Sequence, residues 1–299
     1  MSVFDKLIVG TLPLVPKFIV GRVAARYVAG ENLDQAVALI RKLNGEGAMA
    51  TVDLLGEEVR DHAKATEAVT EYLRILERIE KEKLDANISV KPTQIGLNFD
   101  EKFCRDNYDQ LAAAAKGRGN FMRLDMEDRT TTDATLKIYR YCHERHGNVG
   151  PVLQAYMRRT LRDIAELPEN CVSVRICKGI YVEPREAAFK AYETVRLNYL
   201  QCLEALLRRG IYVGIATHDE HLVCGALGIL DRLGVPRDRY EFQMLLGVDN
   251  QLRKILIDGG HRLRVYVPYG RDWYHYSMRR LRENPQVAGH VARALLRGE

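Results

Sequence analysis

The stretch YVGIATHDEHLVCGALGILDRLGVPRDRYEFQML, residues 212–245, decides the fold. It begins with a short apolar run, Tyr212–Thr217, that predicts a strand. The run His221–Leu233 has apolar residues at helical spacing, and Gly234 follows it as a typical helix-terminating residue. A second strand-like run, Tyr240–Leu245, comes next. The stretch therefore predicts one complete strand–helix–strand unit.

The same pattern recurs along most of the chain. The eight expected strands are Ala48–Leu55, Asn87–Lys91, Phe121–Met126, Val149–Tyr156, Val172–Cys177, Tyr212–Thr217, Tyr240–Leu245 and Leu263–Val267. The expected helices between them include Glu57–Lys83, Phe99–Lys116, Thr132–His146, Pro184–Arg209 and His221–Leu233. Glycines follow several of these helices, at positions 117, 147, 210, 234 and 260. Eight strand–helix units in a chain of 299 residues predict an α/β fold of the (β/α)8, or TIM-type, barrel class.

A doubly wound parallel sheet is the competing fold. It is disfavoured because no G-x-G-x-x-G motif follows any strand, and the chain has no Walker-type P-loop either. We expect two parts in the chain, an N-terminal helical segment in residues 1–45 and the catalytic barrel in residues 46–299.

The composition is typical of a globular protein, with 46% hydrophobic residues and a net charge of +5. Basic and acidic residues are interleaved, which disfavours nucleic acid as a partner. The six cysteines are scattered singly without a C-x-x-C pair. This spacing favours reduced thiols and a cytoplasmic location over disulfides or zinc.

The N-terminal run Leu7–Gly21 is apolar, but Pro13, Pro16 and Lys17 interrupt it before it reaches the length of a membrane span. A signal peptide is weakly supported, because a single lysine precedes the run and no small-residue cleavage site stands out. We expect a helix that packs on the rest of the protein or lies on a membrane surface.

Polar residues stand at the end of nearly every expected strand. Each one alone could cap a helix or lie in a solvated loop. Because the carboxyl ends of barrel strands meet at one face, the set as a whole predicts a site there. Its members are Asp53, Glu57, Lys91, Asp125, Glu127, Gln154, Arg175, Lys178, Tyr181, Thr217, His218, Asp219 and Gln243.

A second candidate surface lies near the C-terminus. Tyr276, Arg279, Arg280 and Glu283 are spaced i, i+3, i+4 and i+7, so a helix would carry all four on one face. The arginine fork matches a carboxylate bidentately, which suggests a small carboxylate-bearing ligand. The alternative is a solvated basic helix, because the surrounding segment is rich in arginine.

Metal chemistry is a weaker possibility. His218, Asp219 and His221 are close in sequence, and Asp53 or Asp125 could add a carboxylate. A zinc hydrolase barrel usually carries an H-x-H pair on a strand, and this chain has none. We therefore expect no catalytic metal.

Four motifs together resemble the flavin-dependent proline dehydrogenase family, in its short, monofunctional bacterial form. The resemblance extends from about Asp53 to Pro285. It implies a distorted barrel of the TIM type, a final helix over the barrel mouth, and FAD bound without a Rossmann fold. The motifs are Arg175-x-x-Lys178-Gly179-x-Tyr181, Ala216-Thr217-His218, Phe242-Gln243-Met244-Leu245, and Tyr276-x-x-Arg279-Arg280-x-x-Glu283.

The resemblance also implies roles for individual residues. Arg175, beside the flavin N5, and Asp125 are the expected catalytic residues. The expected cofactor-binding residues are Met126, Gln154, Arg175, Lys178, Gly179, Ile180, Thr217 and His218. The expected substrate-binding residues are Lys91, Arg279, Arg280, Tyr266, Tyr276, Leu245, Glu283 and Glu57. Ile180 departs from the family pattern, which often has alanine at this position.

Three finer expectations concern the same residues. Asp125 is expected to pair with Lys91 and orient it. A pKa of Lys91 depressed by nearby cations would make it a candidate base for the substrate amine. Gly56 permits an unusual turn, from which Glu57 could reach Arg279 and form an ion-pair gate.

The activity implied is oxidation of L-proline to Δ1-pyrroline-5-carboxylate, the first step of proline catabolism. The hydride would pass to FAD N5 and the electrons to a membrane quinone, which places the protein in the cytoplasm or peripherally on the inner membrane. A pyrroline-5-carboxylate dehydrogenase is a further candidate partner.

Three alternatives remain open at the level of sequence. The first is another flavin barrel such as a methylenetetrahydrofolate reductase, and the second is an aldolase-type barrel with Lys91 or Lys178 as a Schiff base. The third is a basic nucleic-acid-binding protein.

Overall fold

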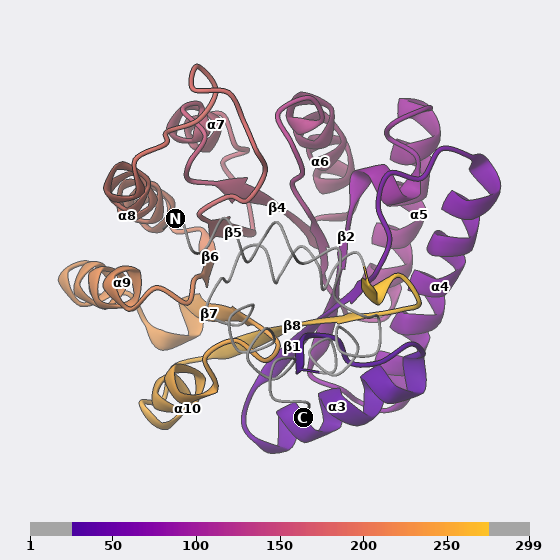
Figure 1. Cartoon of the computed structure of the whole chain (residues 1–299), viewed down its shortest axis with the longest axis horizontal. Helices are drawn as coiled ribbons and strands as arrows, with labels where there is room; N and C mark the ends of the chain where they lie inside the picture. Colours follow the sequence, from indigo (N-terminus) through magenta and orange to yellow (C-terminus); the bar gives the residue numbers. More distant parts are fainter. Residues whose placement is uncertain (1–25, 275–299) are drawn as a thin grey trace, which may run out of the picture.

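The computed structural model of the chain describes residues 26–274. Within them, eight parallel strands form a closed barrel in which each strand bonds to the next and β8 bonds back to β1. Figure 1 shows the ring of strands inside a ring of helices. The prediction of a (β/α)8 barrel is confirmed. The strands are β1 (Met49–Leu54), β2 (Ala86–Val90), β3 (Met122–Leu124), β4 (Val149–Gln154), β5 (Ser173–Cys177), β6 (Tyr212–Ala216), β7 (Tyr240–Leu245) and β8 (Leu263–Tyr269).

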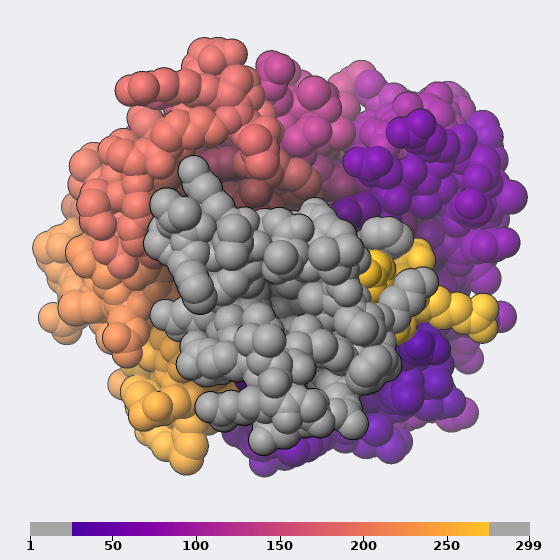
Figure 2. Space-filling model, viewed as in Figure 1, coloured from indigo at the N-terminus to yellow at the C-terminus, as the bar shows by residue number. Residues whose placement is uncertain are grey.

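The helices alternate with these strands and form the outer wall, which is continuous in the space-filling view (Figure 2). They are α3 (Leu33–Gly45), α4 (His62–Lys81), α5 (Glu101–Gly117), α6 (Thr132–His146), α7 (Thr160–Ala165), α8 (Tyr192–Arg208), α9 (Glu220–Arg232) and α10 (Asn250–Asp258). Two 3-10 turns, η2 (Pro92–Ile95) and η3 (Arg237–Arg239), complete the elements. None of the helices within residues 26–274 has the length and apolar character needed to span a membrane.

Two expected helices begin later than predicted. The helix expected from Glu57 begins at His62, because the Asp61 side chain accepts the Lys64 N–H at 2.9 Å and caps its first turn. The helix expected from Pro184 begins at Tyr192. Residues 178–191 form a loop instead. One contact that fixes this loop is the hydrogen bond that the buried Glu183 carboxylate accepts from the Arg129 N–H at 2.7 Å.

Helix α3 lies in the expected N-terminal segment but shares the hydrophobic core of the barrel. Its buried face consists of Ala36, Val37, Ile40 and Leu43. The helix packs against β1 and β8, where the barrel closes. The division at residue 45 stays a prediction. The expected helix over the mouth and the apolar run Leu7–Gly21 lie outside the described residues.

The two faces of each strand differ in polarity. On β5, Val174 and Ile176 are fully buried against the helices, whereas Ser173 and Arg175 point into the barrel. Side chains on a strand alternate with a period of two, so the same division recurs around the ring. The barrel interior is therefore largely polar, and the apolar core is the layer between strands and helices. Gly214 on β6 makes room inside, since a Cβ atom there would overlap the Gln243 amide.

Candidate active site

A cavity of about 1130 Å³ opens at the carboxyl ends of the strands. Strand ends and the loops after them supply its walls, as expected for this barrel class. Twelve of the residues to which the family resemblance assigns a role line it: Lys91, Asp125, Met126, Gln154, Arg175, Lys178, Gly179, Ile180, Thr217, His218, Leu245 and Tyr266. The polar strand ends are thus brought together in one place, as the sequence predicts.

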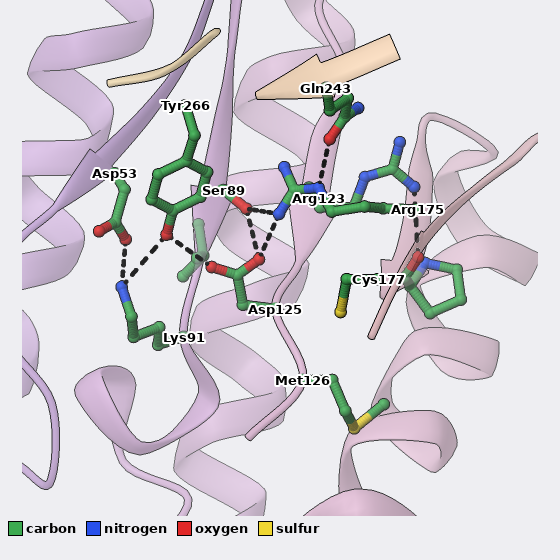
Figure 3. Close-up of polar contacts among 12 residues, drawn as sticks. Asp53, Ser89, Lys91, Arg123, Asp125, Met126, Arg175, Cys177, Gln243 and Tyr266 are labelled. Atoms are coloured by element: carbon green, nitrogen blue, oxygen red, sulfur yellow. Dashed lines mark hydrogen bonds and ion pairs between the residues drawn. The ribbon is translucent and has the colours of Figure 1, made fainter. Parts of the chain in front are cut away.

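Asp125 is the centre of the polar network under the cavity (Figure 3). Its Oδ1 accepts hydrogen bonds from Ser89 Oγ at 2.6 Å and from Arg175 Nη1 at 2.8 Å. Its Oδ2 accepts from the Tyr266 hydroxyl at 3.0 Å. Charge-assisted bonds of this kind are strong and directional. The carboxylate therefore ties β2, β5 and β8 together at one point.

Arg175 is held from two sides. Its Nε donates to Gln243 Oε1 at 2.6 Å, and its Nη1 bonds to Asp125 and to Ser89 Oγ, the latter at 3.2 Å. The guanidinium carbon lies 5.4 Å from the centroid of the Tyr266 ring. Within the described residues, Nη2 makes no hydrogen bond. The residue presents a fixed positive charge to a cavity that it lines.

The expected pairing of Lys91 with Asp125 is wrong. Lys91 Nζ instead forms an ion pair with Asp53 Oδ1 and lies 3.5 Å from the Tyr266 hydroxyl. Asp53 is fully buried on β1, directly across from the end of β2. Asp125 is already engaged by Arg175, which the sequence did not identify as its partner.

The proposed role of Lys91 as a base also needs correction. Burial opposes the charged form, but the Asp53 and Asp125 carboxylates outweigh burial and raise the pKa of Lys91 above its usual value. Lys91 therefore favours its charged form at neutral pH. It suits the recognition of a carboxylate and cannot accept a proton from a substrate amine.

The part of the cavity wall formed by the ends of β3 and β4 carries a hydrogen-bond acceptor without a partner among the described residues. Gln154 Nε2 donates to the Met126 and Glu127 carbonyls at 3.2 and 2.7 Å, which fixes the amide. Gln154 Oε1 is buried and has no hydrogen-bond partner among the described residues. A buried amide oxygen of this kind is suited to the N–H of a bound ligand.

Glu127 connects three loops at the mouth. Its carboxylate accepts the Thr93 N–H at 2.9 Å and the Thr93 hydroxyl at 2.7 Å. Thr93 Oγ1 in turn accepts the Glu58 N–H at 3.1 Å, in the loop after β1. Burial raises the pKa of Glu127 to about 7, against the opposing effect of the Thr93 hydrogen bonds. A titratable group therefore holds the loop that carries Glu57.

A second polar group forms the opposite rim. Asp219 accepts from Tyr192 Oη at 2.6 Å, from Arg196 at 2.8 and 3.0 Å, and from Lys178 Nζ at 3.2 Å. His218, next along the chain, accepts the Leu245 N–H at Nε2 at 2.8 Å. The neutral ring therefore carries its proton on Nδ1.

The expected gate is not tested. Gly56 does adopt a left-handed backbone, with φ of 147°, and Glu57 is exposed on the loop that follows and does not line the cavity. The residues expected on the last helix, Tyr276, Arg279, Arg280 and Glu283, lie outside the described residues. Their roles stay predictions.

The sequence named Asp53 and Gln243 at strand ends but gave them no role, and it missed Ser89. The alternation of strand residues could have found Ser89, because it lies two residues before Lys91 on the inward face of β2. In residues 26–274 no three His, Cys, Asp or Glu side chains are grouped to hold a metal ion.

A sequence model of the family described as "Proline dehydrogenase" matches residues 36–293. The chain is 36% identical to "Proline dehydrogenase" of Deinococcus radiodurans, over 92% of this chain and 90% of that protein. It is 33% identical to "Proline dehydrogenase 1" of Bacillus subtilis strain 168, over 92% and 91%.

The chain matches only part of the length of its longer relatives. The chain is 26% identical to the "Bifunctional protein PutA" of Salmonella typhimurium, over 90% of this chain and 24% of that protein. Among solved structures, proline utilization A from Bdellovibrio bacteriovorus superposes with a TM-score of 0.85 at 24% identity, over 94% of this chain and 36% of that one. This likeness shows that the two proteins share the barrel fold.

Proposed function

Because the chain belongs to the proline dehydrogenase family, whose reaction is the first step of proline catabolism, we propose that it oxidises L-proline to Δ1-pyrroline-5-carboxylate with FAD as its cofactor. When bound, FAD would accept the hydride at its N5 atom, and the electrons would pass to a quinone. The observation that carries the proposal is the Lys91–Tyr266–Asp125–Arg175 network beneath the cavity.

The residues that line the cavity suit a flavin. The unpaired Gln154 Oε1 offers an acceptor for the N–H of a pyrimidine ring. Gly179 lines the cavity with φ of 103°, and a Cβ atom there would overlap the Tyr156 ring. Glycine is therefore required here by the left-handed turn and by the Tyr156 ring, and the turn forms part of the cavity wall. Lys178 and His218 lie on the same wall and could hold its polar groups.

Proline presents a carboxylate and a secondary amine on a small apolar ring. Lys91 supplies a cation whose pKa is raised, so it stays charged while it holds that carboxylate. Arg279 and Arg280, beyond the described residues, are proposed as the second and third cations. Leu245 and Tyr266 would pack against the ring. The raised pKa of Lys91 also disfavours the aldolase alternative, since a Schiff base requires a neutral amine.

Arg175 is proposed to stabilise the negative charge that reduction places on the flavin. Its guanidinium is fixed by Gln243 and Asp125 before any ligand binds. A preorganised charge of this kind does not have to reorient during the reaction, which makes it effective. Asp125 contributes by holding Arg175 and Tyr266 in position.

The visible spectrum of the purified protein tests the proposal. We expect flavin bands that bleach when L-proline is added without oxygen, and a yellow supernatant after acid precipitation, because no linking Cys or His motif is recognised. Identification of the released cofactor as FMN, or a colourless protein, would contradict it.

A further test concerns the electron acceptor. We propose that the protein works as a peripheral protein at the inner membrane, where a quinone accepts the electrons, and that a pyrroline-5-carboxylate dehydrogenase uses its product. Proline-dependent reduction of a quinone in lipid vesicles should exceed reduction of the same quinone in detergent. Equal rates would remove the membrane from this proposal.

Replacement of the arginines tests the substrate site. Arg279→Met or Arg280→Met should weaken proline binding by about 2–4 kcal/mol, the scale for loss of one partner in a desolvated, charge-assisted contact. The flavin content should stay near normal. If both variants keep the wild-type kcat/KM, the last helix does not bind the substrate.

A further inference from the structure

Among residues 26–274, seven charged side chains fill the barrel interior, and six of them form three ion pairs. The pairs are Asp53–Lys91, Asp125–Arg175 and Glu241–Arg264. The seventh is Arg123 on β3, and none of the ion pairs within residues 26–274 includes it. The interior of the barrel therefore carries one excess positive charge.

The groups that bond to the Arg123 guanidinium are neutral. The guanidinium donates to Ser173 Oγ at 2.8 Å and to the carbonyls of Ser173 and Pro151 at 3.2 and 3.3 Å. The Phe121 ring packs below it, at 4.7 Å from the guanidinium carbon. The side chain is 3% exposed. These bonds engage both terminal nitrogens of the guanidinium but bring no carboxylate to it, so the charge is left uncompensated.

The fold makes specific room for this side chain. A Cβ atom at Gly150 on β4 would overlap the Ser173 carbonyl oxygen and would lie 2.6 Å from Arg123 Nη1, so a larger residue there would disturb both the guanidinium and its acceptor. Burial and then the neighbouring Arg175 lower the pKa of Arg123 to about 9. The residue is still cationic at neutral pH, despite the large cost of an unpaired buried charge.

Glu183 is buried near the mouth but pairs with Arg129. Glu127 is also buried there, and it is not the counter-charge either. It bonds to Thr93 outside the ring of strands, and the carboxylate that most influences Arg123 is Glu241, which is already paired. The uncompensated charge thus belongs to the barrel interior.

Arg123 lies below the cavity without lining it, whereas Asp125, two residues further along the strand, does line it. Two residues of strand correspond to about 7 Å along the strand. Figure 3 shows Arg123 in the same region of the interior as Asp125 and Gln243. A charge at this depth can act on a bound ligand through its electric field, but without contact.

We propose that Arg123 is a positioning charge for the redox chemistry, which raises the reduction potential of the bound flavin through the uncompensated field of its guanidinium. The proposal rests on the proposed binding of FAD in the cavity. Reduction adds negative charge to the flavin, so an excess cation in the interior favours the reduced state. This electron-withdrawing field would help proline to give up its hydride.

The size of the effect follows from the distance. If the charge that reduction adds lies about 10 Å from the guanidinium, at an effective dielectric constant of about 20, the equilibrium between reduced and oxidised flavin would change roughly tenfold. For a two-electron couple, tenfold corresponds to about 30 mV. This shift is measurable by anaerobic titration of the holoenzyme against a reference dye.

A matched pair of variants at Ser173 separates charge from packing. Ser173→Asp places a carboxylate beside Arg123, where Ser173 Oγ now lies 2.8 Å away, and so cancels the excess charge without removal of the arginine. Ser173→Asn has the same shape and no charge. We expect the potential of the aspartate variant to be about 30 mV below that of the asparagine variant, a tenfold change.

A second readout is the affinity for sulfite, which adds to oxidised flavin as an anion and responds to the same field. Sulfite should bind the Ser173→Asp holoenzyme roughly tenfold more weakly than the Ser173→Asn holoenzyme. Arg123→Lys should retain the wild-type potential, whereas Arg123→Met should shift it in the direction of Ser173→Asp.

The Glu241–Arg264 ion pair, at the floor of the barrel, provides a control in which the net charge does not change. Arg264→Met combined with Glu241→Gln removes one positive and one negative charge, so the net charge of the interior is unchanged and the potential should stay at the wild-type value. Equal potentials and equal sulfite affinities in Ser173→Asp and Ser173→Asn would overturn the inference about Arg123. A wild-type protein that holds no flavin would instead overturn the proposed function, and this inference with it.

Discussion

The mouth and the floor of the barrel contain similar buried ion pairs with different surroundings. At the mouth, the Asp53–Lys91 and Asp125–Arg175 pairs place Lys91, Asp125 and Arg175 against the cavity. At the floor, Glu241 and Arg264 pair at 2.8 Å and neither lines it.

Gln243 joins the two regions, because it bonds to Arg175 at 2.6 Å and to Glu241 at 2.5 Å. Burial and pairing are thus common to both regions. Access to the cavity is what makes the mouth pairs candidates for chemistry, and a buried ion pair alone does not identify a functional site.

The largest expected effect is at the mouth. Lys91→Met should leave the buried Asp53 carboxyl without its cation, which should lower the free energy of unfolding by about 3–5 kcal/mol. It should also lower kcat/KM for proline by about 2–4 kcal/mol, since the cation for the carboxylate is lost. Urea unfolding and steady-state kinetics measure the two losses.

The double variant Lys91→Met/Asp53→Asn separates these losses. It removes both charges, so most of the stability should return while kcat/KM stays low. If both quantities recover together, Lys91 supports the fold and does not bind the substrate.

The second largest expected effect is a loss of stability at the floor. Arg264→Met should also cost about 3–5 kcal/mol in the free energy of unfolding, because Glu241 is 2% exposed and would lose its partner. The kcat/KM of the folded fraction should change by less than about threefold, or about 0.7 kcal/mol. A loss of activity as large as that of Lys91→Met would show that the floor and the mouth act as one unit.

A smaller effect depends on pH. Burial raises the pKa of Glu127 from 4.5 in the unfolded chain to about 7 in the folded protein. Between these values the folded protein binds one more proton than the unfolded chain, so the free energy of unfolding falls as the pH rises. The expected loss between pH 5 and pH 7 is about 2 kcal/mol, at about 1.4 kcal/mol for each unit.

Glu127→Gln should abolish this fall of the unfolding free energy with pH. The amide oxygen of the new glutamine should still accept a hydrogen bond from Thr93. The floor carboxylate provides the contrast, because Arg264 outweighs burial and holds the pKa of Glu241 at about 2, so it stays ionised throughout this range. Parallel curves of unfolding free energy against pH for the wild type and Glu127→Gln would be inconsistent with a raised pKa at Glu127.

The smallest effect is on the surface. Lys254 and Asp258 form an i, i+4 ion pair at 2.7 Å on α10, with side chains 76% and 59% exposed. Water screens such a pair, so Lys254→Ala should change the free energy of unfolding by only about 0.2–0.5 kcal/mol. A loss above about 1 kcal/mol would weaken the argument that burial sets the cost of breaking a pair.

The sequence correctly predicted that polar residues at the strand ends meet at one cavity, while their roles stay predictions. Arg175 and Gln154 are polar residues in otherwise apolar runs, and barrel geometry brings such positions to one face. The partner of Lys91 was predicted wrongly, because the choice between Asp53 and Asp125 depends on the register of neighbouring strands. The true pair joins adjacent β1 and β2, while Arg175 reaches across the interior to Asp125.

The predicted direction of the pKa shift at Lys91 was wrong for the same reason. The sequence shows many cations near this site, but the pKa depends on which charges lie within a few ångströms, and those are the Asp53 and Asp125 carboxylates. The late start of α8 was also missed, because the loop at residues 178–191 is fixed by a contact between Glu183 and Arg129 that is distant in sequence.

The sequence by itself determined the alternation of strands and helices, and with it the barrel and the face that carries the site. These features follow from the local periodicity of apolar residues, which each segment expresses alone. Only the tertiary structure decided which charges pair and which one, Arg123, is left over. Electrostatic energies fall with distance and rise with burial, and both quantities exist only once the strands have closed into a ring.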